Sequence, residues 1–198
     1  MATGATYTNI AASTALVANR FVVSTNMANG AYTVANASPA WQGGCRIVAT
    51  ITGVTGNDTP GTITVVGTDL AGNALTEVIT LVAGGTATGA KVFRTVTSIT
   101  QAGWIINTGN DTIVIGCEAG AIACGTSGTL YAIVVNATAA ATVVLADSVL
   151  TVATLKVSIA EGSYLFGQGT DFVGFLRVST TSTNDVTVIH TPTSPSGL

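Results

Sequence analysis

Short β-type runs separated by turn residues are the feature that most limits what this chain can fold into. Each run is rich in Val, Ile or Thr, which suit a pleated and half-buried surface. Turn sequences such as Asp58-Thr-Pro-Gly61 and Asp69-Leu-Ala-Gly-Asn73 stand between the runs. Many short, regularly spaced strands are typical of β-sandwiches and barrels, so we expect an all-β fold. The predicted strands lie at 47–51, 62–66, 75–82, 112–115, 130–135, 142–145, 150–157, 172–178 and 186–189.

The composition indicates a folded protein with a weakly charged surface. Asp, Glu, Lys and Arg make up only 8% of the residues, whereas hydrophobic residues make up 47% and consist largely of Ala and Val. Disordered chains show the opposite combination of low hydrophobicity and high charge. A monomer with so few charges tends to associate, and we therefore expect much of the surface to be covered in use.

A stretch of small residues at 119–128 separates two β-rich blocks and predicts a domain boundary. The first twenty residues are rich in Ala, Thr and Asn, and they are compatible with either a short helix or an extended arm. The last residues carry two prolines and no core signal. The expected organisation is an N-terminal arm at 1–20, a β domain at 21–118, a linker at 119–128, a second β domain at 129–191 and a tail at 192–198.

One pentapeptide occurs twice. Thr55-Gly-Asn-Asp-Thr59 recurs as Thr108-Gly-Asn-Asp-Thr112, and each copy precedes a β run. Gly and Asn tolerate positive φ, and Asp bonds to nearby backbone, so both copies are predicted to form the same turn. A common turn in a Thr-rich chain is favoured over a true duplication, and two copies are too few for a solenoid.

The titratable residues argue against catalysis. Nine carboxylates, two lysines and the single His190 are available to build an active site. His190 follows an alternating run with Val186 and Val188, where a packed or solvent-edge histidine is favoured over a general base. A paired-acid glycosidase would have to draw on Asp147, Glu161 and Asp171, whose spacing does not single them out. We expect a non-enzymatic protein with no catalytic residues.

No metal or cofactor site is expected either. The Asp69–Asn73 turn superficially resembles a calcium loop, but Leu70 and Ala71 stand where ligands would be needed. The three cysteines lack a CxxC spacing and cannot all pair within one chain. Buried thiols in a protein made in a reducing cytosol are the expected state of Cys45, Cys117 and Cys124.

The charge and hydropathy patterns exclude two classes of partner. The uncharged stretch 119–146 is interrupted by Gly, Asn, Ser and Thr, which favours two strands over a membrane span. The N-terminal stretch lacks the unbroken apolar run of a secretory signal. Nucleic-acid binding needs clustered basic residues, whereas here they are scattered: Arg20, Arg46, Lys91, Arg94, Lys156 and Arg177.

Two stretches resemble tailed-phage virion proteins. The first, 61–81 followed by 91–100, combines a strand, a Gly-Thr-Asp-x-x-Gly-Asn turn, a Thr-Glu strand and a Phe-x-x-Val-x-Ser-Ile strand, and resembles a β module of phage structural proteins. The second begins with Gly128-Thr-Leu-Tyr-Ala-Ile-Val-Val-Asn136 and includes 171–178 and 185–189. It is similar to the jelly-roll-like domains of capsid decoration (cement) proteins and head fibres, which are commonly trimeric.

The resemblance implies two β-sandwich or jelly-roll-like domains and a structural role in the virion. It implies a decoration protein made in the host cytoplasm, which binds major capsid protein on the outer surface of the head as a homotrimer and stabilises the shell. On this hypothesis the terminal segments 1–19 and 191–198 reach neighbouring subunits. The alternatives are a head fibre, a tail tube or tail-tip subunit, a glycan-binding tail module and a bacterial surface adhesin.

Overall fold

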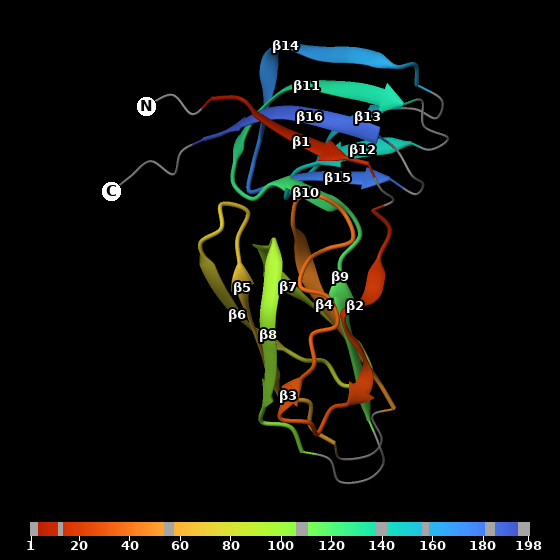
Figure 1. Cartoon of the computed structure of the whole chain (residues 1–198), viewed down its shortest axis with the longest axis vertical. Coiled ribbons are helices and arrows are strands. Elements are labelled where there is room, and N and C mark those ends of the chain that lie inside the picture. Colours follow the sequence, from red (N-terminus) through yellow and green to blue (C-terminus); the bar gives the residue numbers. More distant parts are fainter. Residues whose placement is uncertain are drawn as a thin grey trace. The chain divides into compact units, whose positions relative to one another are not determined.

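The computed structural model of the chain describes residues 4–11, 14–53, 58–105, 111–137, 142–155, 159–180 and 185–193. These residues contain no helix, and 66% of them lie in strands that form four antiparallel sheets (Figure 1). The expected all-β, sandwich-like fold is therefore confirmed. Because the described part of the chain is built from strands, it holds no helix long and apolar enough to cross a membrane.

The strands divide between two compact units. The terminal unit contains Met1–Ala15, Ala40–Gly43 and Ala119–Leu198, and so includes both ends of the chain. The inserted unit contains Leu16–Pro39 and Gly44–Glu118. In sequence order the inserted unit stands between the first and second strands of the terminal unit.

The inserted unit consists of two four-stranded sheets, β2-β9-β4-β7 and β3-β8-β5-β6. Alternation along the strands explains how each sheet buries one face: in β5, Ile63 and Val65 are fully buried while their neighbours are partly exposed. Phe21, Phe93 and Ile113 are also fully buried. The strands are β2 (Val17–Asn26), β3 (Ala31–Tyr32), β4 (Cys45–Thr52), β5 (Thr62–Thr68), β6 (Ala74–Thr80), β7 (Thr86–Phe93), β8 (Thr95–Ala102) and β9 (Thr112–Cys117).

The terminal unit is built in the same way from the sheets β1-β16-β11-β14 and β10-β15-β12-β13. Its core contains Ile10, Leu130, Leu145, Phe172 and Leu176, all at most 1% exposed. The strands are β1 (Thr6–Ile10), β10 (Ala121–Cys124), β11 (Gly128–Ala137), β12 (Val143–Ala146), β13 (Thr151–Leu155), β14 (Gly162–Phe172), β15 (Leu176–Thr180) and β16 (Asp185–Pro192).

Both units share one strand order. If the eight strands of each unit are numbered in chain order, the two sheets read 1-8-3-6 and 2-7-4-5 in both units. This is the order of a jelly roll, the eight-stranded double sheet of two Greek keys. In the sequence, one jelly roll is therefore inserted into the other, between the first and second strands of the terminal unit.

The N-terminal segment is not the arm expected at 1–20. Residues 6–10 form β1, which pairs antiparallel with β16 from Thr6 opposite His190 to Ile10 opposite Val186. The side-chain amide of Asn9 donates to a carboxylate oxygen of Asp185 at 2.7 Å. The partner strand lies at the other end of the sequence, so no local pattern could reveal this pairing.

The segment expected to be a linker at 119–128 contains β10, whose residues are all buried. Small residues permit close packing here: a Cβ at Gly120, where φ is +96°, would come within 2.6 Å of the Arg177 side chain. The bounds of the units thus differ from the expected 21–118 and 129–191. The expected tail at 192–198 begins within β16, which ends at Pro192, and residues 194–198 lie outside the described part of the chain.

The predicted strand at 172–178 is two strands. Phe172 ends β14 and Leu176 begins β15, with a turn between them in which Gly174 has a φ of +77°. Positive φ suits a turn and interrupts an extended strand. The other predicted runs all overlap observed strands, namely β4, β5, β6, β9, β11, β12, β13 and β16.

The position of β1 predicts a difference between two substitutions in the same strand. Ile10→Ala should lower the free energy of unfolding by about 2–5 kcal/mol, because Ile10 is fully buried and its loss leaves a cavity. Tyr7→Ala should change it by less than about 1 kcal/mol, because that side chain is 67% exposed. Denaturant unfolding of both variants measures the difference, and equal stabilities would show that residues 6–10 are not part of the sandwich.

Candidate functional site

A row of apolar side chains crosses the outer face of the sheet β1-β16-β11-β14. Cross-strand register places Tyr7 opposite Ile189, Ile189 opposite Ala132, and Ala132 opposite Leu165. Tyr131, at the bulge in β11 beside Ala132, adds a second aromatic ring. Leu165 is 78% exposed, Tyr7 67% and Tyr131 39%, whereas Ile189 is partly exposed and Ala132, which links them across β11, is only 3% exposed. We call these five residues the apolar row.

Neutral polar side chains and two carboxylates that accept hydrogen bonds from them border the apolar row. On one side, Asp185 accepts hydrogen bonds from the amides of Asn136 at 2.8 Å and Asn9 at 2.7 Å. These two bonds lower the pKa of Asp185 and tie β16 to both neighbouring strands. On the other side, Thr129 donates to Asp171 at 2.8 Å. No lysine or arginine stands on the described strands of this sheet.

The apolar row is suited to binding a surface and unsuited to catalysis. Its side chains offer hydrocarbon, aromatic rings and phenol groups, and a flat sheet face of this kind buries apolar area when another protein docks on it. Charged residues are depleted in the cores of protein interfaces, as they are here. The row is the strongest candidate binding surface among the described residues.

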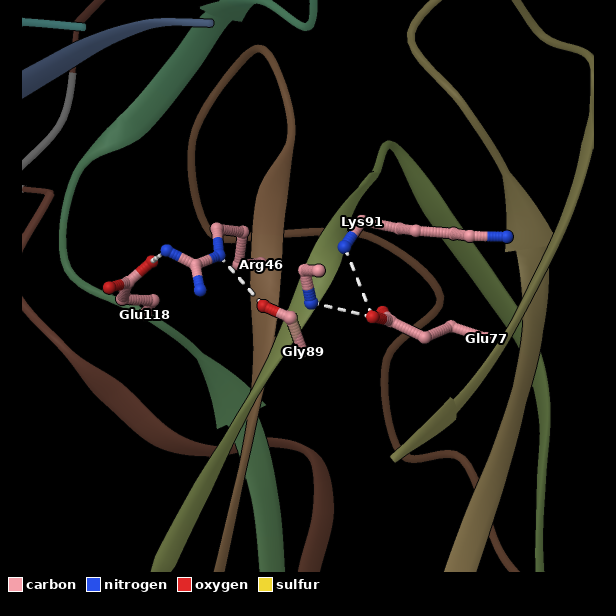
Figure 2. A network of polar contacts seen from close by, with 6 residues as sticks. Arg46, Glu77, Gly89, Lys91 and Glu118 are labelled. Carbon is pink, nitrogen blue, oxygen red and sulfur yellow. Dashed lines mark hydrogen bonds and ion pairs between the residues drawn. The ribbon is translucent and has the colours of Figure 1, made fainter. Parts of the chain in front are cut away.

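A polar network joins the two sheets of the inserted unit at their edges (Figure 2). Glu77 on β6 reaches across to β7, where its Oε1 accepts hydrogen bonds from the backbone amides of Ala90 at 2.5 Å and Lys91 at 3.1 Å. These amides are available because β7 bulges away from β4 at this point. The carboxylate thus replaces the ladder partners that the bulge removes.

Arg46 holds the bulge from the other side (Figure 2). Its Nε donates to the carbonyl of Gly89 at 2.7 Å, and its guanidinium lies 3.5 Å from the Glu118 carboxylate. Gly89 is required by this arrangement, since an added Cβ would lie 2.5 Å from Oε2 of Glu77. Glu77 and Arg46 therefore have a structural role.

We predict that Glu77→Ala lowers the free energy of unfolding by about 2–4 kcal/mol, because two backbone amides lose a charged acceptor. Glu118→Ala is the matched control and should cost less than about 1 kcal/mol, because its ion pair with Arg46 is partly exposed. Urea unfolding of the two variants gives both values. A Glu77 variant as stable as the Glu118 variant would contradict a structural role for Glu77.

His190 lies in the core of the terminal unit. It is 1% exposed, packs edge-on against Phe172 with ring centroids 6.4 Å apart, and has its Nε2 3.3 Å from the Thr8 hydroxyl. Its Nδ1 is buried without a hydrogen-bond partner among the described residues. Burial lowers the pKa of His190. The side-chain polar group that the described residues place against the ring is the Thr8 hydroxyl.

The low pKa of His190 predicts a loss of stability in acid. The histidine of the unfolded chain takes up a proton near pH 6.5, whereas the buried histidine of the folded chain resists protonation. Above that pH, His190 is neutral in both states and the folded chain keeps its full stability. The stability falls as the pH drops towards the folded-state pKa, by at most about 1.4 kcal/mol per pH unit. Thermal melts of the wild-type chain and His190→Gln between about pH 5 and 7 should show a steeper decline for the wild type. Parallel curves would contradict this assignment.

Two of the three acids considered for glycoside hydrolysis are hydrogen-bonded within turns or strands. Asp147 accepts hydrogen bonds from the amides of Leu150 and Val149, and from Val173, which together lower its pKa and hold the turn between β12 and β13. Asp171 bonds to Thr129 on the outer sheet face, and Glu161 is exposed. Among the described residues no group of three or more His, Cys, Asp or Glu side chains gathers as a metal site would require.

The Asp69–Asn73 segment is a turn. The Asp69 carboxylate accepts hydrogen bonds from the backbone amides of Ala71 and Asn73, both at 2.9 Å, and Gly72 supplies a φ of +88°. Its oxygens are thus used within the hairpin between β5 and β6.

All three cysteines are buried and free. Cys45 and Cys117 are in the inserted unit with their sulfurs 2.7 Å apart, and Cys124 is in the terminal unit. Burial and the adjacent Cys117 raise the pKa of Cys45, which keeps the thiol protonated. A buried, protonated thiol is unreactive.

The repeated pentapeptide brings together two residues that sequence reasoning did not single out. Asp58 from the first copy and Asp111 from the second are both buried in the inserted unit, and burial together with the adjacent Asp58 raises the pKa of Asp111. The repeat itself was the available signal, although it indicated only a shared turn. Residues 54–57 and 106–110 lie outside the described part of the chain.

Comparison of the chain with protein-family models, with curated proteins and with solved structures found no match.

Proposed function

We propose that this chain is a non-enzymatic structural protein of a tailed-phage virion, and specifically a capsid decoration protein. Its partners would be major capsid protein on the outer surface of the head and further copies of itself in a homotrimer. The proposal starts from the resemblance of 61–81 and 91–100 to a phage β module, and of 128–136, 171–178 and 185–189 to decoration-protein domains. The first set falls in the inserted unit and the second in the terminal unit.

The jelly-roll strand order of the terminal unit supports this proposal. Decoration-protein-like domains were expected to be jelly rolls, and the terminal unit has the eight strands and two Greek keys of that fold. A fold alone does not define a function. The strand order therefore supports the proposal only together with a surface suited to assembly.

The apolar row is the observation that carries the assembly role. Leu165 and Tyr7 expose most of their apolar surface on a sheet face that has no basic side chain. We assign this face to contact between copies of the chain, because the cores of self-association interfaces are apolar and poor in charge. Contact with the head shell would then use other surfaces of the trimer.

Binding would be the whole mechanism. A closed trimer presents three equivalent contacts, which match a local threefold position on a shell. Each contact can be weak, because simultaneous engagement of several contacts raises the overall affinity. The N-terminal segment cannot reach a neighbour along its whole length, since residues 6–10 are paired with β16 in their own unit.

Native mass and co-sedimentation with purified phage heads test the proposal. The wild-type chain should behave as a trimer and sediment with heads. Leu165→Glu should dissociate the trimer, because it replaces the most exposed apolar side chain of the row, at its β14 end, with a charge. Val78→Glu is the matched control: Val78 is 62% exposed on β6 of the inserted unit and should leave the trimer intact.

The same experiments identify the outcomes that would contradict the proposal. A monomer that fails to sediment with heads would eliminate the decoration role. A ring of six, or sedimentation with tails alone, would place the chain in a tail tube or tail tip instead. A trimer that survives Leu165→Glu would move the contact between copies away from the apolar row.

A further inference from the structure

Two buried carboxylates lie at one end of the inserted unit. Asp111 directly precedes β9 and is fully buried, on the same inward face as Ile113 two residues later. Asp58 stands just before β5 and is 8% exposed. The neighbouring residues Thr59 and Ile105 pair through two backbone hydrogen bonds of 3.0 and 3.1 Å, which join the two segments.

The segment after β2 closes this end of the sandwich. The backbone amide of Met27 donates to the carbonyl of Asp111 at 3.1 Å. A few residues on, the carbonyl of Gly30 accepts from the amide of Gln101 on β8 at 3.3 Å. Gln101 lies opposite the fully buried Ile63, so its side chain also belongs to the inward face. Asp111 and Gln101 thus approach the interior from opposite sheets at the same end.

Three side-chain oxygens at this end have no N–H or hydroxyl donor among the described residues. They are Oε1 of Gln101 and both carboxylate oxygens of Asp111, whose carboxyl group interacts instead with the carboxyl of Asp58. An isolated buried carboxylate is costly, and buried polar groups nearly always have a partner. The interaction with this second carboxyl, that of Asp58, increases the cost of ionising both. Either a proton or a cation must compensate for the charge.

We propose that Asp58 and Asp111 together bind one divalent cation, Ca²⁺, inside the inserted unit. Two carboxylates neutralise the charge of a divalent ion. The side-chain atoms named above are oxygens, which are the ligands that calcium prefers. No nitrogen or sulfur ligand that would favour zinc is grouped with them among the described residues. Burial of Asp111 favours binding, because a dry site strengthens the attraction between carboxylate and cation.

The site explains why the same pentapeptide occurs twice. In the sequence, one copy precedes β5 and the other precedes β9, and these two strands belong to opposite sheets. Each copy contributes one buried aspartate, and the two aspartates interact. A turn needed only for local geometry would not require its acid to be buried, as the partly exposed turn acid Asp69 shows.

Calcium binding by the full chain is tested directly. The chain is stripped with EDTA and dialysed against radioactive calcium, and its thermal unfolding is followed as calcium chloride is added. One ion should bind per chain, and the melting temperature should rise by about 5–10 °C at one hundred times the dissociation constant. Magnesium, which demands octahedral geometry, should give a smaller rise.

Three variants separate this site from other carboxylates. Asp58→Asn and Asp111→Asn should each abolish both the bound calcium and the rise in melting temperature. Asp69→Asn, in the surface turn of the same unit, should retain both. In EDTA, Asp111→Asn should melt no lower than the wild-type chain, because the variant removes a buried charge that has no counterion. This last measurement shows that the variant folds.

Two results would overturn the proposal. One is a stripped chain that binds no calcium and melts at the same temperature with and without it, in which case the two carboxyls share a proton. The other is calcium binding that survives in Asp58→Asn and Asp111→Asn, which would place the ion elsewhere. Neither result bears on trimer formation or head binding, so the calcium site and the decoration role are tested independently.

Discussion

The antiparallel pairing of β1 with β16 is the constraint on which the rest of this chain depends. It joins the two ends of the sequence in one sheet, and β10, the next strand of the same sandwich, comes only after the whole inserted unit. The terminal unit therefore buries Ile10 and Val186 together only when residues far apart in the sequence have met. Contacts of such long sequence separation carry a large loop-closure cost, and the inserted unit reduces this cost if it folds first and holds its own ends in place.

The few charged residues of this chain mostly serve its backbone. Glu77 accepts hydrogen bonds from two backbone amides at the β7 bulge, Asp69 from two in the turn after β5, and Asp147 from two in the turn after β12. Charges used in this way leave the sheet faces neutral, and the apolar row is one result. Low charge and exposed hydrocarbon are unfavourable for a solitary soluble protein. They are favourable for a subunit that works in an assembly, which is the role we propose.

Sequence patterns predicted the strands whose two faces differ most in burial. The runs at 62–66 and 112–115 alternate clearly and lie in β5 and β9. Prediction failed at β14, where Gly167 and Gly169 adopt positive φ in a wide bulge and break the alternation. It also failed at β10, because small residues are common to linkers and to strands packed closely against a neighbour. The exposed Leu165 of the apolar row lies in β14. Because the sequence patterns did not predict this strand, they did not predict the apolar row either.

The sequence by itself determined the all-β class, the scarcity of catalytic groups and the positions of most turns, because the alternation of side chains and the preferences of Gly, Asn, Asp and Pro are local properties. Only the tertiary structure decided which strands pair, and hence that two jelly rolls are nested, that residues 6–10 complete a sheet and that Asp58 meets Asp111. The physical reason is that a period of two specifies which face of a strand is buried and does not specify its partner. Partners are selected by the packing of the whole core, to which residues from both ends of the chain contribute.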